Sequence, residues 1–428
     1  MHTSAYAPTD ACGPVDWTFD VPGGTVVIDG KMAAGSATRR AADGGGEAMP
    51  TVLIEGGFPS GAMPRIHASS AFTPASKAFL ADAVASIDGE LRKMLPGLAF
   101  TVPFIVASPS EPGTYWGDVA NRTVMRLSFF PTPGPEQEKL LHAFVTHEMA
   151  HLSQPSVWND SWKEDSATIG EGGAEFLRVV TASRLGWLDR PGVQAELDQA
   201  VNACVLAAEG KSWKTMRNRN WGMNPYHCGL TFYLVGLERG PASTPALLRL
   251  RDYYVKAKQG QPTDFAQALE CGAAQGCAPR WIPRMAGSEP LDTVLQAYAR
   301  QPGSLLRTTS EIAPAMVKPL AFRHVGALMR ADCNGSISMY HEPASARIAD
   351  GPTCKTLRPG MIVTSAEGLP LFDGSAALEA SVAACRTQGK TVLGMRDGSK
   401  VAMSCDASVS LPAQLYRVDA TRALELAR

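Results

Sequence analysis

Residues 147–151 read His-Glu-Met-Ala-His, and residues 170–176 read Gly-Glu-Gly-Gly-Ala-Glu-Phe. Positions i and i+4 of a helix lie on one face, so the imidazoles of His147 and His151 converge on a single point. Glu148 follows the first histidine directly, and its carboxylate can reach a water bound to a metal at that point. The pattern predicts one zinc ion per chain, because zinc lowers the pKa of bound water and polarises a scissile carbonyl.

The histidines also admit a purely structural interpretation, because the motif fixes only three residues. Leu140 and Phe144 lie on the same helical stripe, so both imidazoles could be hydrogen-bonded core groups. The second segment favours the metal. Glu171 and Glu175 again stand at i and i+4 beside apolar residues, where two carboxylates are costly to bury unless they serve a metal or its ligands. One carboxylate then binds zinc, and the other accepts a hydrogen bond from a ligand histidine and fixes its tautomer.

The composition is that of a soluble globular protein with room for two or three domains. The chain has 428 residues, of which 45% are hydrophobic and 19% charged, and its formal net charge is −1. This near-neutral balance gives no reason to expect a nucleic-acid partner. No run approaches the about 18 consecutive apolar residues of a membrane span. The expected partner is a peptide or protein substrate, and the oligomeric state stays open.

Nine cysteines inform the choice of compartment. None lies in a CxxC pair, and eight of them fall into four local pairs that leave Cys12 over: Cys204 with Cys228, Cys271 with Cys277, Cys333 with Cys354, and Cys385 with Cys405. The alternative is a set of scattered buried thiols in a cytosolic enzyme. We favour disulfides, and therefore a periplasmic or secreted protein whose leader is absent from this sequence. The cytoplasm stays open as the alternative, since residues 1–17 show no signal peptide.

The remaining pattern predicts an α+β fold. Residues 1–65 are rich in Gly, Pro, Thr and Val and predict a β-rich N-terminal segment. Strands are expected at 25–28, 51–54, 101–107 and 123–130, helices at 76–95, 136–154, 170–185 and about 193–208, and a helix-rich region at 229–300. Around 303–320 the composition shifts and short β-type runs begin, which predicts a separate C-terminal domain.

Residues 147–151, residues 170–176 and the spacer between them resemble the HExxH, spacer and NEGFA block of gluzincin peptidases, notably the aminopeptidase N family. Within the spacer, the sequence Trp158-Asn159-Asp160 is also similar to the corresponding sequence of that family. The resemblance implies a thermolysin-like catalytic domain at 66–305, with Glu171 as the third zinc ligand. It also implies that Glu175 supports a ligand residue, because more distant gluzincins have such an acid four residues after the ligand. If Glu175 were itself the ligand, the spacer would be longer than in the family.

The resemblance extends to a tyrosine and to an edge strand. Gluzincin aminopeptidases stabilise the oxyanion with a tyrosine in a YxKG-like context, which implies this role for Tyr226, although Cys228 stands where the lysine would be. The family's GAMEN block, whose glutamate binds the substrate α-amine, corresponds to residues 117–121 here. Gly117 and Asp118 are therefore candidate substrate-binding residues, but Ala120 replaces the glutamate.

The C-terminal segment 320–412 resembles a PDZ domain, which the glycyl aminopeptidase family also appends to its catalytic domain. The sequence at 357–371 is similar to the "LkpGD-I-vnGkpl" pattern of PDZ domains. A helix expected at 375–385 and a hairpin expected at 391–404 follow in the order found in that domain. Another small β domain is the alternative. The loop at 334–337 departs from the GLGF pattern that would bind a peptide carboxylate.

Together these patterns predict a zinc metallopeptidase. Glu148 would act as general base towards the attacking water, and Tyr226 would donate a hydrogen bond to the oxyanion. Because Ala120 departs from the aminopeptidase pattern, an endopeptidase is as open as an aminopeptidase. Two other classes stay open: a non-catalytic peptide- or protein-binding protein that retains the gluzincin fold, and a zinc hydrolase of non-peptide substrates such as an epoxide or ester.

Overall fold

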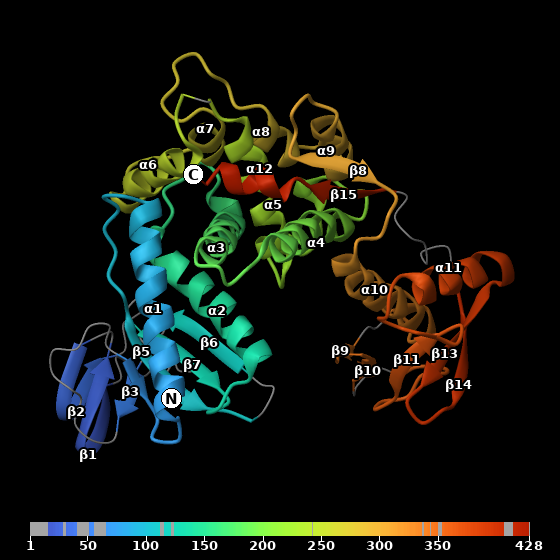
Figure 1. Ribbon diagram of the computed structural model, residues 1–428, viewed down its shortest axis with the longest axis horizontal. Helices are drawn as coiled ribbons and strands as arrows, with labels where there is room; N and C mark the ends of the chain where they lie inside the picture. The colour runs from blue at the N-terminus through green and yellow to red at the C-terminus, as the bar shows by residue number, and fades with distance from the viewer. Residues whose placement is uncertain are drawn as a thin grey trace, which may run out of the picture. The chain divides into compact units, whose positions relative to one another are not determined.

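The computed structural model (Figure 1) divides into two compact units. The first comprises Met1–Asp189, Phe232–Ile282 and Leu424–Arg428, and the second comprises Arg190–Thr231 and Pro283–Ala423. The structure describes residues 16–28, 31–40, 51–54, 66–111, 115–120, 124–241, 243–335, 338–342, 344–349, 353–405 and 414–427. Cys12, Asn121 and the second half of the loop at 334–337 lie outside these residues. The boundaries 1–65, 66–305 and 320–412 stay predictions.

The N-terminal strands of the first unit form a small antiparallel sheet of order β2-β1-β3. Its members are β1 (Asp16–Ile28), β2 (Lys31–Arg40) and β3 (Thr51–Ile54). The two strands expected at 25–28 and 51–54 pair with each other, with Thr25 opposite Ile54. Phe19, Val21 and Val26 form its buried cluster.

A second sheet carries the strand that matters for the site. It contains β4 (Ile66–Ala68), β5 (Phe104–Pro109), β7 (Val124–Phe129) and β6 (Tyr115–Ala120), in that order. The first three strands run parallel, and β6 pairs antiparallel with β7 at the edge. Successive residues of β5 and β7, such as Phe104 with Ile105 and Val124 with Met125, are buried on both faces of the sheet.

Three helices of the first unit pack together beside this sheet (Figure 1). They are α1 (Pro74–Met94), α2 (Pro135–Ala150) and α3 (Ser166–Arg184). Thr73 caps α1 by accepting the Ser76 N–H, and Pro135 occupies the first turn of α2, where its missing N–H has no intrahelical partner to lose. α2 packs against α1, α3 and β6, so the predicted HExxH lies at the centre of this unit.

Shorter elements complete the first unit. α3 begins four residues earlier than expected, because the short helix η2 (Lys163–Asp165) leads directly into it. The others are η1 (His151–Ser153), α6 (Ala246–Lys258) and α7 (Phe265–Glu270), while α5 (Asn224–Arg239) and α8 (Trp281–Met285) cross between the units.

The second unit corrects one expectation from the sequence. Short β-type runs were expected from about 303; β8 (Leu306–Thr309) is one, but the residues that follow it, Pro314–Asp332, form the long helix α10. Pro319 lies close to the start of α10, and burial of Met316, Leu320 and Leu328 outweighs the one hydrogen bond that the proline removes. The remaining helices are α4 (Arg190–Ala208), η3 (Trp213–Thr215), α9 (Leu291–Ala299) and α12 (Ala420–Glu425), the last ending in the first unit.

The end of the chain returns to pair with a distant strand. β15 (Leu415–Val418) lies antiparallel to β8, with Val418 opposite Leu306. Asn202 of α4 fixes this strand, because its side chain accepts the Tyr416 N–H and donates to the Tyr416 carbonyl. Sequence patterning missed this pairing, since the two short strands are more than a hundred residues apart.

The C-terminal sheet has the order β14-β13-β11-β10-β9, with β12 paired to β11. All its pairs are antiparallel. Its elements are β9 (Met339–His341), β10 (Ala346–Ile348), β11 (Ile362–Ala366), β12 (Leu369–Pro370), α11 (Ala376–Gln388), β13 (Lys390–Met395) and β14 (Lys400–Ser404). α10 and α11 contribute to the same hydrophobic core as the strands.

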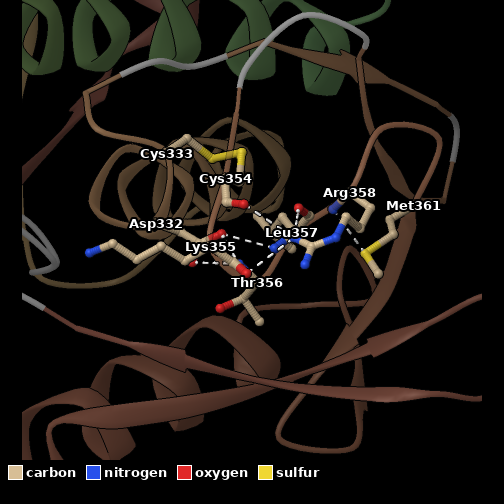
Figure 2. Close-up of a disulfide and its surroundings, with 8 residues drawn as sticks. All are labelled: Asp332, Cys333, Cys354, Lys355, Thr356, Leu357, Arg358 and Met361. Atoms are coloured by element: carbon tan, nitrogen blue, oxygen red, sulfur yellow. Dashed lines mark hydrogen bonds between the residues drawn. A yellow bond between two sulfur atoms is a disulfide. The ribbon is translucent and has the colours of Figure 1, made fainter.

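The end of α10 is tied to the loop before β11 (Figure 2). The Asp332 carboxylate accepts the N–H groups of Thr356 and Leu357 at 2.9–3.0 Å, and Cys333 next to it is disulfide-bonded to Cys354. All four predicted cysteine pairs are confirmed as disulfides. None of the helices in the described part of the chain combines the length and apolar character that crossing a membrane requires.

A buried histidine lies at the head of a directed hydrogen-bond chain in the second unit. The Thr391 hydroxyl donates to the Glu367 carboxylate, so its oxygen accepts from Ser381, 2.7 Å away. The Ser381 oxygen in turn accepts from Nε2 of His324, also at 2.7 Å. Burial lowers the pKa of His324 to about 4, because the charged imidazolium loses its hydration there.

This histidine makes stability depend on pH. Between pH 6.5 and about 4 the unfolded chain binds a proton that the folded unit rejects, so the free energy of unfolding falls by up to about 3 kcal/mol as the pH drops. Denaturant unfolding of the wild type and of His324→Gln, which keeps an N–H donor but does not titrate, measures this contribution. If the free energy of unfolding fell by the same amount with decreasing pH in both proteins, His324 would not be the cause.

Candidate metal centre

Three side-chain atoms of the first unit converge on one point. Nε2 of His147 lies 3.1 Å from Nε2 of His151 and 3.1 Å from Oε2 of Glu171. Nε2 of His151 lies 3.3 Å from the same Glu171 oxygen. The two histidines come from the end of α2 and the start of η1, and the glutamate comes from the second turn of α3. The structure thus brings together the three residues that the sequence proposed as ligands.

The other nitrogen of each imidazole determines its tautomer. Nδ1 of His147 lies 2.7 Å from a Glu175 oxygen, which can only accept, so this nitrogen carries the proton. Nδ1 of His151 lies 3.1 Å from Oε1 of Gln154, whose amide nitrogen is used to donate to the Gly170 carbonyl. Each neutral imidazole therefore turns the lone pair of its Nε2 towards the other and towards the Glu171 carboxylate.

Such a cluster of electron pairs requires a positive charge. Burial by itself would lower the pKa of His147, but hydrogen bonds to Glu171 and Glu175 outweigh it and raise the pKa to about 9. Burial likewise favours the neutral form of Glu171, but the contacts with His147 and His151, in which a protonated imidazole donates to the carboxylate, hold its pKa at about 2. The pocket therefore favours either a bound proton or a bound cation between its three inward-facing atoms.

Glu175 anchors the centre from behind, where the resemblance placed a supporting acid. Its carboxylate accepts from Nε and Nη2 of Arg178, the latter at 2.7 Å, and also from His147. Burial opposes its ionisation, but the Arg178 charge and the His147 hydrogen bond hold its pKa well below the usual range. Sequence reasoning missed Arg178 and Gln154. Arg178 stands three residues after Glu175, so the i, i+3 rule could have found it.

Glu148 differs from the other carboxylates of the centre. Burial raises its pKa, and the negative charges of Glu171 and Asp118 act in the same direction, against the lowering effect of the two histidines. A carboxylate with a raised pKa is a better proton acceptor than an ordinary one at neutral pH. The predicted general base therefore lies in surroundings that suit the role.

The glycines of the Gly-Glu-Gly-Gly-Ala-Glu-Phe segment let aromatic side chains approach α3 closely. A Cβ on Gly173 would lie 2.2 Å from the Tyr254 hydroxyl and 2.7 Å from the Tyr233 hydroxyl. Tyr233 donates to the Ile169 carbonyl at 2.9 Å, two residues before Glu171. The absence of a side chain at Gly173 thus allows two tyrosines to hold the backbone that positions Glu171.

The spacer between the two segments is fixed by a buried acid. Asp160 accepts hydrogen bonds from the Tyr253 and Thr263 hydroxyls at 2.9 and 2.7 Å, and from the Trp162 N–H. The Trp158 ring stacks against Tyr253 at a centroid distance of 5.7 Å. These contacts hold the chain between α2 and α3 against α6, so the spacer returns the carboxylates to the histidines.

The edge strand β6 lies along α2. A Cβ on Gly117 would lie 2.4 Å from the Phe144 ring of α2, so only glycine allows this approach. Asp118 stands opposite Arg126 of β7 and accepts from its Nε at 2.8 Å and from its Nη2. Of the described side chains, this pair is the charged feature of β6.

Tyr226 lies in the second unit, in the first turn of α5 and half-buried. Cys228, two residues later, is joined to Cys204 of α4, which restrains this turn of the helix. The role of Tyr226 at the zinc centre stays a prediction.

The close approach at Gly173 can be tested with a matched pair of variants on the same helix. Gly173→Ala should lower the free energy of unfolding by about 1–3 kcal/mol, because two buried tyrosine hydroxyls must move. Gly170→Ala should be neutral or stabilising, since its new Cβ would meet no atom closer than 3.7 Å. Thermal and denaturant unfolding compare the two; equal effects would contradict the packing argument.

Comparison with known proteins gives the fold. No family model matches the sequence, and no curated protein matches it either. An aminopeptidase N family protein from Idiomarina loihiensis aligns with 98% of this chain and 78% of its own, at 10% identity and a TM-score of 0.52. Yeast LTA4 hydrolase, solved in complex with bestatin, aligns with 74% of this chain and 51% of its own, at 13% identity and a TM-score of 0.40. The first match confirms the resemblance to the aminopeptidase N family at the level of the fold.

Proposed function

We propose that this chain is a zinc-dependent peptidase, with His147, His151 and Glu171 as the ligands of one zinc ion. The observation that carries the proposal is the convergence of two imidazole lone pairs and a carboxylate oxygen within 3.1–3.3 Å of one another. Both imidazoles are oriented by a hydrogen bond from their other nitrogen, as zinc-binding histidines are.

The donor set fits zinc in type and size. The two Nε2 atoms and the Glu171 oxygen, 3.1–3.3 Å apart, would hold a zinc ion between them, because zinc takes imidazole nitrogen and carboxylate oxygen as ligands. Two imidazoles and one carboxylate are the protein ligands of many catalytic zinc sites, which leave a fourth position for water or substrate. A structural zinc would instead use four protein ligands.

The residues around the ion would divide the work of peptide hydrolysis. Zinc, when bound, supplies Lewis-acid polarisation of the scissile carbonyl and lowers the pKa of a bound water. Glu148 accepts the proton of the attacking water and delivers it to the leaving amine nitrogen. Tyr226 donates a hydrogen bond to the oxygen that becomes negatively charged. Glu175 and Arg178 hold the His147 ring in place throughout.

The finer expectations about organisation belong to the same proposal. We assign a thermolysin-like catalytic domain to 66–305 and a PDZ-like domain to 320–412, in which the β11–β12 hairpin, α11 and the β13–β14 hairpin follow one another in the expected order. Four disulfides favour an oxidising compartment, so we place the protein in the periplasm or outside the cell.

Replacing the general base separates catalysis from metal binding. Glu148→Gln should lower kcat for peptide cleavage by about 10²–10⁴-fold, because the attacking water loses its proton acceptor. The variant should still hold one zinc per chain, because Glu148 is not a ligand. Peptide-library cleavage followed by mass spectrometry measures the first effect, and elemental analysis measures the second.

Three outcomes would contradict this assignment. Wild-type protein purified without chelators and lacking zinc would overturn the metal centre. Zinc-loaded protein that cuts no peptide but binds a partner tightly would favour a non-catalytic binding protein. Turnover of esters or epoxides without peptide cleavage would favour a hydrolase of non-peptide substrates.

The tyrosine can be tested by removing one oxygen atom. Tyr226→Phe should lower kcat by about 10²–10³-fold with little change in KM, since the hydrogen bond forms only as charge develops. Tyr340→Phe, at a tyrosine of the C-terminal sheet that is 63% exposed, is the control. Equal kcat values for the two variants would exclude Tyr226 as the oxyanion donor.

A further inference from the structure

The edge strand β6 offers an open backbone next to the catalytic helix. β6 has one neighbour, β7, and no described strand pairs with its outer side. Its Gly117 and Tyr115 face Phe144, which stands about one helical turn before the ligand His147. An extended polypeptide added to this edge would therefore lie beside the zinc centre, held by main-chain hydrogen bonds.

The one acidic side chain of β6 is already neutralised. Asp118 receives two hydrogen bonds from the guanidinium of Arg126 on the neighbouring strand. A paired carboxylate and guanidinium carry no net charge, so they offer little attraction to an incoming ammonium group. An ammonium that approached Asp118 would also meet the positive charge of Arg126 at the same place.

Arg126 is held so that it cannot easily leave this pair. Its side chain is only 16% exposed, and its guanidinium lies 5.4 Å from the centre of the Trp116 ring. A substrate amine that displaced it from Asp118 would leave a largely buried cation without its carboxylate, which is strongly unfavourable. The alternation of side chains along a strand puts Trp116 and Asp118 on the same face, together with their shared partner.

The other carboxylates of the centre are engaged as well. Glu171 faces the two ligand histidines, Glu175 is bound by Arg178 and His147, and Glu148 is the base of the proposed reaction. Glu171 and Asp118, whose charges both act on Glu148, each have a partner of their own. Neither is available to mark the position of a free amino terminus.

We propose that β6 binds substrate through its open backbone edge, that its described side chains provide no anchor for an α-amino group, and that the substrates are polypeptides cut at internal bonds. This inference rests on the proposed peptidase function and specifies its substrate class. Main-chain hydrogen bonds read an extended backbone irrespective of where the chain begins, so a substrate can continue past the zinc centre in both directions. The exposed rings of Tyr115 and Trp116, 45% and 51% accessible, are placed to contact apolar substrate side chains.

Matched peptides test the inference on the zinc-loaded full chain. A cleavable library peptide is synthesised with a free and with an acetylated amino terminus, and products are identified by mass spectrometry. The two kcat/KM values should agree within about threefold, with cleavage at the same internal bond. A preference for the free amine of about 100-fold or more, with release of the first residue, would overturn the inference while supporting peptidase activity. Cleavage of neither form would overturn the proposed function and this inference with it.

Freeing the carboxylate provides a second test. Arg126→Gln leaves Asp118 without its cation, so the ratio of kcat/KM for free over acetylated peptide should rise about five- to tenfold. The double variant Asp118→Asn with Arg126→Gln has no charge at either position, and its ratio should return to that of the wild type. An unchanged ratio in Arg126→Gln, with an unchanged melting temperature, would show that the ion pair does not control recognition of the amino terminus.

Discussion

Two imidazoles that point their lone pairs at each other and at a carboxylate form the constraint on which this structure depends. The arrangement is repulsive unless a cation or a proton lies between the three groups, and it persists because each ring is held from its other side. Glu175 holds His147, and Gln154 holds His151. Through these two residues α2 and η1 are hydrogen-bonded to α3. The packing of these helices therefore determines the geometry of the centre.

Electrostatic roles around the centre follow from the partners of each carboxylate. Glu175 is paired with Arg178 and stays ionised as a support of His147, while Glu171 faces the two histidines and stays ionised in the position we propose for a ligand. Burial favours the neutral form of all three carboxylates, but Glu148 is the one whose pKa is raised on balance, which suits proton transfer. The same residue type thus stands in three different electrostatic environments around the proposed metal centre, and the presence or absence of a neighbouring cation makes the difference.

The parts that sequence predicts well are those whose geometry is local. Helical spacing alone put His147 beside His151 and Glu171 beside Glu175, because a turn of helix fixes those neighbours. Sequence patterning did not find Arg126 as the partner of Asp118, since that contact depends on strand register rather than spacing. It also expected short β-type runs around 303–320 and so missed the start of α10, a helix that contains Pro319 and that tertiary burial stabilises.

Sharing a fold with an aminopeptidase N family protein does not settle what this chain cuts. A zinc centre activates any carbonyl that reaches it, so the difference between trimming a chain end and cutting within a chain lies in what the adjoining surface recognises. A free amino terminus is recognised by an uncompensated negative charge. On β6 that charge is compensated by Arg126, which is itself fixed by Trp116 and by burial. Hydrolysis and the recognition of chain ends are therefore separable, and in the function that we propose a cation on the neighbouring strand separates them.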